Sequence, residues 1–135
     1  MAITYTSANK ILDYSFGATS FVIPATYYFA LSTSSPSIDG TNFTEPVGNN
    51  YSRVSFTNNK TNWGTASNAS LTNSVAIQWA ESTGSWGTIV AVGMYDASTS
   101  GNLYWYDSLS PARSVASATT VLLAISAVTV QMTNS

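Results

Sequence analysis

The stretch GSWGTIVAVGMYDASTSGNLYWYDSL, from Gly84 to Leu109, carries the strongest structural signal in the sequence. Two runs rich in β-branched and aromatic residues, Thr88–Asp96 and Leu103–Leu109, flank the polar loop Ala97–Asn102. Gly101 in that loop can adopt the positive φ that tight hairpin loops require. The pattern therefore predicts a β-hairpin.

Shorter runs with a two-residue period lie on both sides of this hairpin, and polar segments with Gly, Pro, Asn and Asp separate them. The further expected strands are Pro24–Ser32, Tyr51–Phe56, Ser74–Ala80, Val121–Val130 and, after a break at Pro111, a short one at Ala112–Val115. Such spacing is typical of an antiparallel β-sandwich or jelly roll. We predict one all-β domain over residues 1–135 with about seven or eight strands.

One helix is expected near the start of the chain, over Ser7–Gly17. Ser7 is a good N-cap residue, and Gly17 is suited to end the helix. Apolar residues fall on one helix face at Ala8, Ile11, Leu12 and Phe16. We interpret the helix as closing one end of the core, with partner binding as the alternative, and residues Met1–Thr6 as an N-terminal arm.

Charged residues make up only 7% of the chain, against about 25% in typical soluble proteins. The 22 Ser and 18 Thr residues supply polarity instead. The four basic residues are scattered at Lys10, Arg53, Lys60 and Arg113. Because phosphate neutralisation needs clustered Lys and Arg, we expect no nucleic-acid partner. The apolar tail Val115–Val130 is too short for a spanning helix, so we expect a buried strand there and no membrane partner.

The sequence contains neither His nor Cys. This absence excludes a Ser-His-Asp triad, thiolate catalysis and zinc sites built on Cys or His. The carboxylates of Asp96 and Asp107 are expected at separate points of the hairpin rather than as a glycosidase pair. We predict no catalytic, cofactor or metal site.

The long loop Ser34–Asn50 carries the acidic residues Asp39 and Glu45. With Asn42 they could hold Ca²⁺ through oxygen ligands, but their spacing is not that of an EF-hand. The simpler interpretation is an Asp-Gly turn at Asp39 and an ion pair between Glu45 and Arg53 across the base of the loop.

Two expected strands, Thr88–Asp96 and Val121–Val130, are apolar on both faces, whereas one face of a sandwich sheet normally meets water. Loops, the helix or another subunit must cover the outer face, and the low charge favours a subunit. Exposed rings could instead stack on sugars, but three consecutive aromatic residues place rings on both faces of a strand. The candidate interface residues are Val90, Val92, Met94, Trp86, Tyr104, Trp105, Tyr106, Leu122 and Val128.

Four segments give the chain a resemblance to a known family: ANKILDYSFGATSF, YYFALSTSSPSIDGTNFTEPVGNNYSRVSF, NSVAIQWAESTGSWGTIVAVGMYDASTSGNLYWYDSL and VLLAISAVTV. The chain resembles small tailed-bacteriophage virion structural proteins of the capsid decoration, or cement, type, some of which are labelled tail-fibre proteins. The resemblance implies a non-enzymatic β-sandwich protein, made in the bacterial cytoplasm and bound to the capsid exterior of the virion.

On this resemblance the partners are the major capsid protein and further copies of the chain. A homotrimer is preferred, because icosahedral shells offer three-fold junctions, and a dimer comes next. Stabilisation of the head would follow from binding only the assembled shell. The alternatives are a tail or fibre module that binds a host-surface glycan and a lectin-like domain with no virion role.

Overall fold

A computed structural model describes residues 1–132 of the chain; residues 133–135 of the predicted domain lie outside the described residues. The largest element is an antiparallel sheet with the strand order β1-β7-β6-β2-β3. Its strands are β1 (Ala2–Ile3), β2 (Thr26–Ser32), β3 (Val54–Thr57), β6 (Gly87–Tyr95) and β7 (Leu103–Val115). The predicted hairpin is confirmed as β6 and β7, which form the centre of this sheet.

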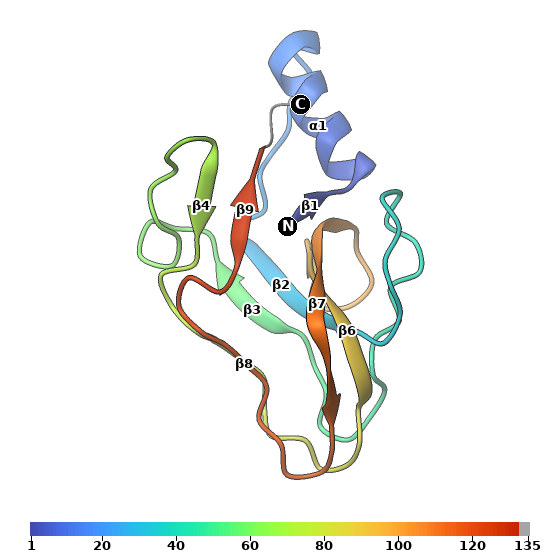
Figure 1. Cartoon of the computed structure of the whole chain (residues 1–135). Helices are drawn as coiled ribbons and strands as arrows, with labels where there is room; N and C mark the ends of the chain where they lie inside the picture. The colour runs from blue at the N-terminus through green and yellow to red at the C-terminus, as the bar shows by residue number, and fades with distance from the viewer. Residues whose placement is uncertain (133–135) are drawn as a thin grey trace.

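A second layer lies across one face of the sheet (Figure 1). It consists of two antiparallel ladders, β4 (Ser70–Thr72) with β9 (Thr129–Gln131) and β5 (Ile77–Gln78) with β8 (Leu122–Leu123). The core between the layers joins Phe29 and Met94 of the sheet to Ile77 and Val128 of the second layer. The predicted all-β sandwich with one short N-terminal helix is thus confirmed.

The β6–β7 pairing is interrupted where the sequence predicted a strand end. Ala91 pairs with Ser108 and Ile89 with Arg113, so residues 109–112 of β7 have no partner on β6. Pro111 lies in this bulge, where its missing N–H breaks no ladder bond. The predicted break at Pro111 is therefore present as a gap in the pairing, but the separate strand Ala112–Val115 is wrong, because β7 continues to Val115.

The same bulge changes which side chains face the core. Strict alternation placed Ile89 on the opposite face from Val92 and Met94. In the structure all three belong to one core cluster. One irregular step in the pairing shifts the faces of the strand, as bulges do.

The other face of the sheet is covered by the loop of residues 33–50, which contributes Phe43. The Phe43 and Tyr95 rings meet edge to face at 5.3 Å between centroids. Gly93 allows this close approach, since a Cβ at that position would lie 2.6 Å from both the Phe43 ring and the Leu103 side chain. Of the alternatives that the sequence left open, a loop covers this face of β6 around Gly93 and Tyr95, so the preference for a subunit is wrong there.

Helix α1 (Tyr5–Gly17) confirms the predicted helix but begins two residues earlier. Thr4, not Ser7, is the N-cap, and its Oγ1 accepts a hydrogen bond from the Ser7 amide. The Thr4 hydroxyl also donates to the Leu103 carbonyl at 2.6 Å, which fixes the first turn of α1 against β7. Residues 2–3 pair with β7 as β1, so Met1–Thr6 is part of the sheet and helix cap rather than an arm.

The predicted strand Val121–Val130 is two short strands, β8 and β9, joined by a bend. Asn73 organises this bend from a fully buried position. Its side-chain Nδ2 donates to the Ala124 carbonyl, and its Oδ1 accepts from the Val128 backbone amide, both at 2.9 Å. A buried amide that satisfies the backbone of a neighbouring segment explains why the apolar run does not stay straight.

Candidate functional site

Glu45 and Arg53 form an ion pair in the structure, across the base of the loop as predicted. The Arg53 Nη2 lies 2.7 Å from Glu45 Oε2, and its Nε donates to Oε1 at 3.0 Å. The Tyr51 hydroxyl donates to the same Oε1 at 2.8 Å. Two donors on one oxygen and one on the other occupy the carboxylate, so Glu45 is placed to hold structure rather than to move protons.

The Arg53 side chain, which is only 6% exposed, also ties this loop to the β6–β7 turn. Its Nη1 donates to the carbonyls of Ala97 and Ser100 at 2.8 and 2.7 Å. The guanidinium stacks over the Tyr95 ring at 3.7 Å from the centroid. One arginine therefore joins two loops and the end of β6 at one end of the sandwich.

Most of the predicted interface residues lie inside the chain itself. Six of the nine are buried: Trp86, Val92, Met94, Tyr104, Trp105 and Val128. Val90 and Tyr106 are partly buried, and Leu122 is exposed. The interpretation of these six as contact residues is corrected, because the second layer, the loop of residues 33–50 and the N-terminal segment cover them.

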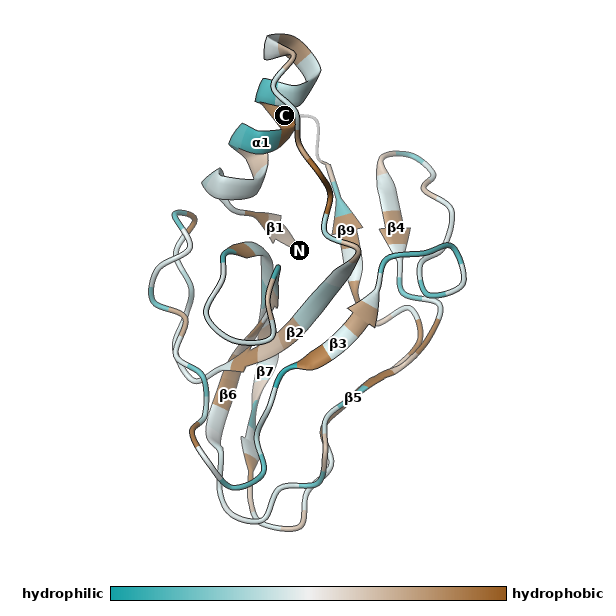
Figure 2. Ribbon diagram, turned by 180° about the vertical axis from the view of Figure 1, so that it is seen from behind, coloured by the Kyte–Doolittle hydropathy of each residue, from teal (hydrophilic) through white to brown (hydrophobic). Residues whose placement is uncertain are grey.

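A run of exposed apolar side chains lies instead on the second half of α1 and the extended chain after it. We call residues 12–23 the arm. Phe16 and Val22 are each 87% exposed, and Leu12, Tyr14 and Ile23 are exposed as well. Figure 2 shows these apolar segments above the body of the sandwich. The helical spacing of Leu12 and Phe16 correctly indicated an apolar helix face. The expectation that this face closes one end of the core is wrong, because both side chains are exposed.

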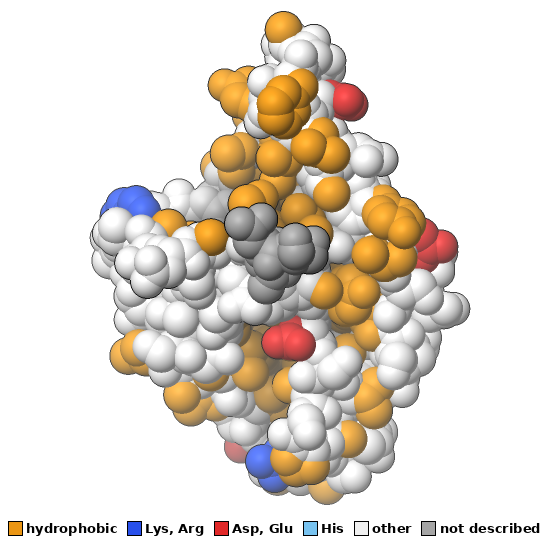
Figure 3. Space-filling model, turned by 45° about the horizontal axis from the view of Figure 1, so that its top comes forward, with side chains coloured by type: hydrophobic (Ala, Val, Ile, Leu, Met, Phe, Trp, Pro, Cys, Tyr) orange, Lys and Arg blue, Asp and Glu red, His pale blue; other side chains and the backbone are white. Residues whose placement is uncertain are grey.

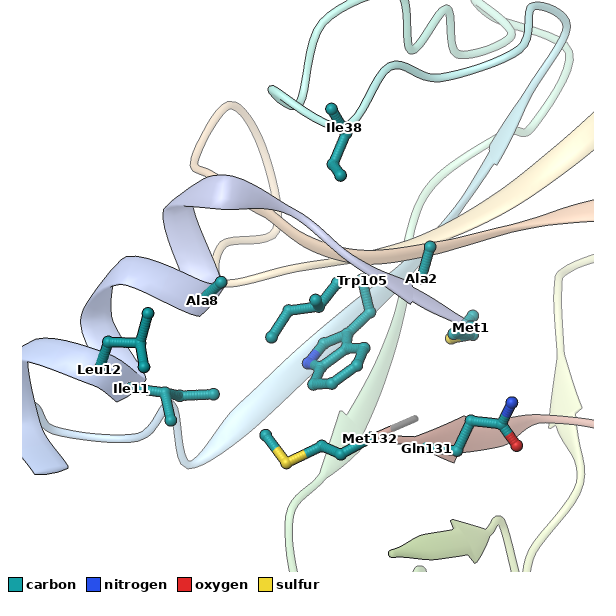
Figure 4. Close-up of a pocket in the computed structure, with 10 residues that line it drawn as sticks. Met1, Ala2, Ala8, Ile11, Leu12, Ile38, Trp105, Gln131 and Met132 are labelled. Atoms are coloured by element: carbon teal, nitrogen blue, oxygen red, sulfur yellow. The ribbon is translucent and has the colours of Figure 1, made fainter. Parts of the chain in front are cut away.

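Two apolar grooves open beside the base of the arm, on either side of Trp105. The first has a volume of about 660 Å³ and is lined by Ile3, Ile11, Leu12, Ile38 and Met132, among others. Figure 4 shows Trp105 in this groove, with side chains from α1 and from the end of β9 around it. The second, about 420 Å³, is lined by Ile23, Tyr27, Trp63, Leu71 and Val130, with Lys60 beside them. We call the two grooves together the Trp105 cleft.

Arm and cleft form one nearly uncharged surface. Figure 3 shows hydrophobic side chains running from the projecting helix down toward the body of the molecule. Lys10 and Asp13 are the charged residues of α1, and Lys60 lies at the second groove. Contiguous apolar patches beyond a few hundred Å² are rare on monomers and mark interaction sites. The geometry is suited to burying apolar surface against a macromolecule.

Three tyrosines around these features have a raised pKa. Burial raises the pKa of Tyr27, in the second groove, to about 12. Burial also raises the pKa of Tyr51, which hydrogen-bonds Glu45, and that of Tyr95, against the opposing effect of Arg53. Each of these side chains is thus held in its neutral form by the fold.

The fold should accordingly lose stability in alkali. A group whose pKa is higher in the folded than in the unfolded state, here about 10 when unfolded, stabilises the fold below that value. This contribution disappears as pH rises from about 10 to 12, because the unfolded chain releases its protons first. Circular dichroism against pH should show unfolding in that window.

Tyr27→Phe removes one of the raised groups, and we expect it to move the alkaline midpoint upward. Tyr5→Phe is the matched control, since Tyr5 is exposed and lies outside the arm, and it should leave the midpoint unchanged. An unchanged midpoint in Tyr27→Phe would contradict the role of Tyr27 in this transition.

The described residues hold no group of three or more acidic, His or Cys side chains that could bind a metal ion. In residues 1–132 no helix has the length and apolar character needed to cross a membrane.

A protein-family model described as "Podophage GP4 fiber I protein gp80" matches residues 2–131 of the chain. The chain belongs to this family. It is therefore a phage virion structural protein, and its place is in the virion. No curated protein matches the chain. In this member of the fiber I family, the arm and the cleft form an exposed apolar surface that carries few charges.

Proposed function

We propose that this chain is a structural building block of a podophage fibre and works by contact with neighbouring proteins, without catalysis. The observation that carries the proposal is the exposed apolar arm beside the Trp105 cleft, in a chain of the fiber I family. A monomer in water gains nothing by exposing Phe16 and Val22, whereas an assembly gains free energy by burying them.

The absence of catalysis is part of the same proposal. Of the carboxylates that sequence analysis considered for chemistry, Glu45 is bonded to Arg53 and Tyr51. Asp96 accepts hydrogen bonds from the amide and side chain of Asn102. Asp107, the second carboxylate of the hairpin, lies 3.8 Å from the N-terminal ammonium group. The sequence has no His or Cys, so the His base and the thiolate that most often serve in nucleophilic catalysis are missing.

Capsid decoration remains the second candidate, in which the same surface would bind the major capsid protein on the outside of the head. The match to a fiber protein favours the fibre. Glycan binding through the aromatic residues of the cleft has less support. Trp63 and Trp105 are both buried, so their ring faces offer little area for a sugar to stack on.

Virions labelled with an antibody against this protein should carry the label on fibres in electron micrographs. Virions that lack the protein should keep heads of normal resistance to heat and low salt, because the shell does not depend on a fibre component. They should lose the labelled fibre and adsorb less well to host cells.

Label spread over the whole head, together with heads that burst at lower temperature when the protein is missing, would contradict the fibre proposal. That result would identify the protein as capsid decoration, stabilising the assembled shell by mass action.

A further inference from the structure

We propose that the arm of one copy packs into the Trp105 cleft of a second copy of this chain. This proposal names a partner for the surface described under the proposed function. It rests on that function only for the place of the contact in the virion. The contact itself is a property of the purified protein.

The arm is an apolar projection whose large side chains are exposed to solvent. Its five exposed side chains, Leu12, Tyr14, Phe16, Val22 and Ile23, include two that are 87% exposed. Given the ~150–250 Å² that one aromatic side chain can bury, they leave on the order of 500 Å² of apolar surface in water. A standard interface buries about 800 Å² per partner, so the arm supplies more than half of one side.

The helical half of the arm is held away from the body, whereas its extended half returns to it through Phe21, whose ring lies 6.4 Å from that of Tyr104. The buried Thr4 and Ser7 fix the first turn of α1 against β7. At the far end the Ala18 and Thr19 amides donate to the Asp13 carbonyl, with Ala18 in the left-handed region at φ 53°. This closed turn sends the chain back along the helix, and the C-terminal end of α1 projects beyond the sheet (Figure 1). Phe16 lies near this end and is 87% exposed.

The Trp105 cleft is an apolar groove that can receive the arm. Both grooves are lined mainly by apolar side chains around Trp105, and the described residues leave them open to solvent. Charge adds one local pairing. Lys60 lies at the second groove and Asp13 is exposed on the arm, so these two side chains have opposite signs. Lys10 is exposed about one turn before Asp13 and has the same sign as Lys60, so charge helps to set which side of the helix faces the groove.

The contact is compatible with closed symmetric oligomers. Arm and cleft are neighbours on one surface, because Leu12 lines the first groove and Ile23 the second, so two copies facing each other can each place an arm over the other's cleft. In a ring of three, each arm would enter the next copy's cleft instead. Both arrangements are closed and use the same residues, so the contact stands for a dimer and for a trimer.

Cross-linking between two single-cysteine variants tests the contact, and the chain has no native Cys to interfere. Val22→Cys places a thiol on the arm and Lys60→Cys places one at the second groove. Mixed and oxidised, the two should form a disulfide-linked heterodimer in good yield. Val47→Cys is the matched control, because Val47 is 93% exposed but lines neither groove.

Equal yields of heterodimer from Val22→Cys and Val47→Cys, each paired with Lys60→Cys, would overturn the proposal. A higher yield for Val22→Cys supports it. Val22→Cys linked to itself more readily than to Lys60→Cys would also overturn it, because the arms would then meet each other.

Substitution of the arm gives a second test. Wild-type protein at micromolar concentration should scatter light as a particle well above 14.3 kDa. The double variant Phe16→Ser, Val22→Ser should fall to the monomer mass with its circular dichroism spectrum unchanged, since neither side chain supports the fold. Val47→Ser should keep the wild-type mass.

A wild-type monomer over the whole concentration range, or an oligomer unaffected by the double variant, would overturn the arm-in-cleft contact. Neither result would move the antibody label on virions, so failure here and failure of the fibre proposal remain distinguishable.

Discussion

Trp86→Ala is expected to lower the free energy of unfolding by about 3–5 kcal/mol, as large-to-small changes of buried aromatic residues do. Trp86 is 3% exposed, and its ring meets Tyr51 edge to face at 5.3 Å. Its indole Nε1 donates to the Asn49 carbonyl at 2.9 Å, which links the loop of residues 33–50 to β6. The variant loses packing contacts, leaves a cavity and leaves the Asn49 carbonyl without its hydrogen bond from the indole.

Urea unfolding followed by circular dichroism measures this loss, at several protein concentrations so that self-association is separated from folding. Trp86→Phe should cost less, because most of the ring volume remains while the hydrogen bond is lost. A loss below about 1 kcal/mol in Trp86→Ala, together with a weakened oligomer, would return Trp86 to the contact role that sequence analysis assigned to it.

Arg53→Met is expected to lower the free energy of unfolding by about 2–4 kcal/mol, less than the ~3–5 kcal/mol for a fully buried ion pair because the Glu45 side chain is 25% exposed. The substitution leaves the Glu45 carboxylate with the Tyr51 hydroxyl as its remaining donor. It also frees the carbonyls of Ala97 and Ser100, which Arg53 now binds. Both loops at that end of the sandwich should loosen together.

The double variant Glu45→Met, Arg53→Met should recover part of this loss, because no charge is then left unpaired. Arg113→Met is the matched control; Arg113 is exposed on β7, so the same substitution should change stability by less than about 0.5 kcal/mol. If Arg53→Met were as mild as Arg113→Met, the pair would be worth no more than a surface salt bridge.

Local patterns in the sequence were sufficient for the elements whose cause is local. The β6–β7 hairpin follows from two alternating runs around a glycine-containing loop. Helix α1 follows from the spacing of its apolar residues. The Glu45–Arg53 pair could be predicted because a chain with four basic residues offers few partners for a carboxylate. In each case the residues are close enough along the chain for their spacing to limit the geometry.

Boundaries and bends depended on contacts that spacing does not reveal. The run Val121–Val130 reads as one strand, but Asn73 binds its backbone from 51 and 55 residues away. β7 passes Pro111 because residues 109–112 bulge out of the pairing with β6. Neither partner can be identified without knowing which segments the fold brings together.

The sequence by itself determined that the chain has more apolar faces than one core should need, and little charge with which to cover them. Only the tertiary structure decided which of those faces are buried. Phe43 seals the second face of β6, whereas Phe16 of the arm, on an equally plain apolar stripe, stays in water. Periodicity reports that a face is apolar, but burial depends on what the rest of the chain packs against it. The proposed interaction surface lies on the helix that the pattern assigned to the core.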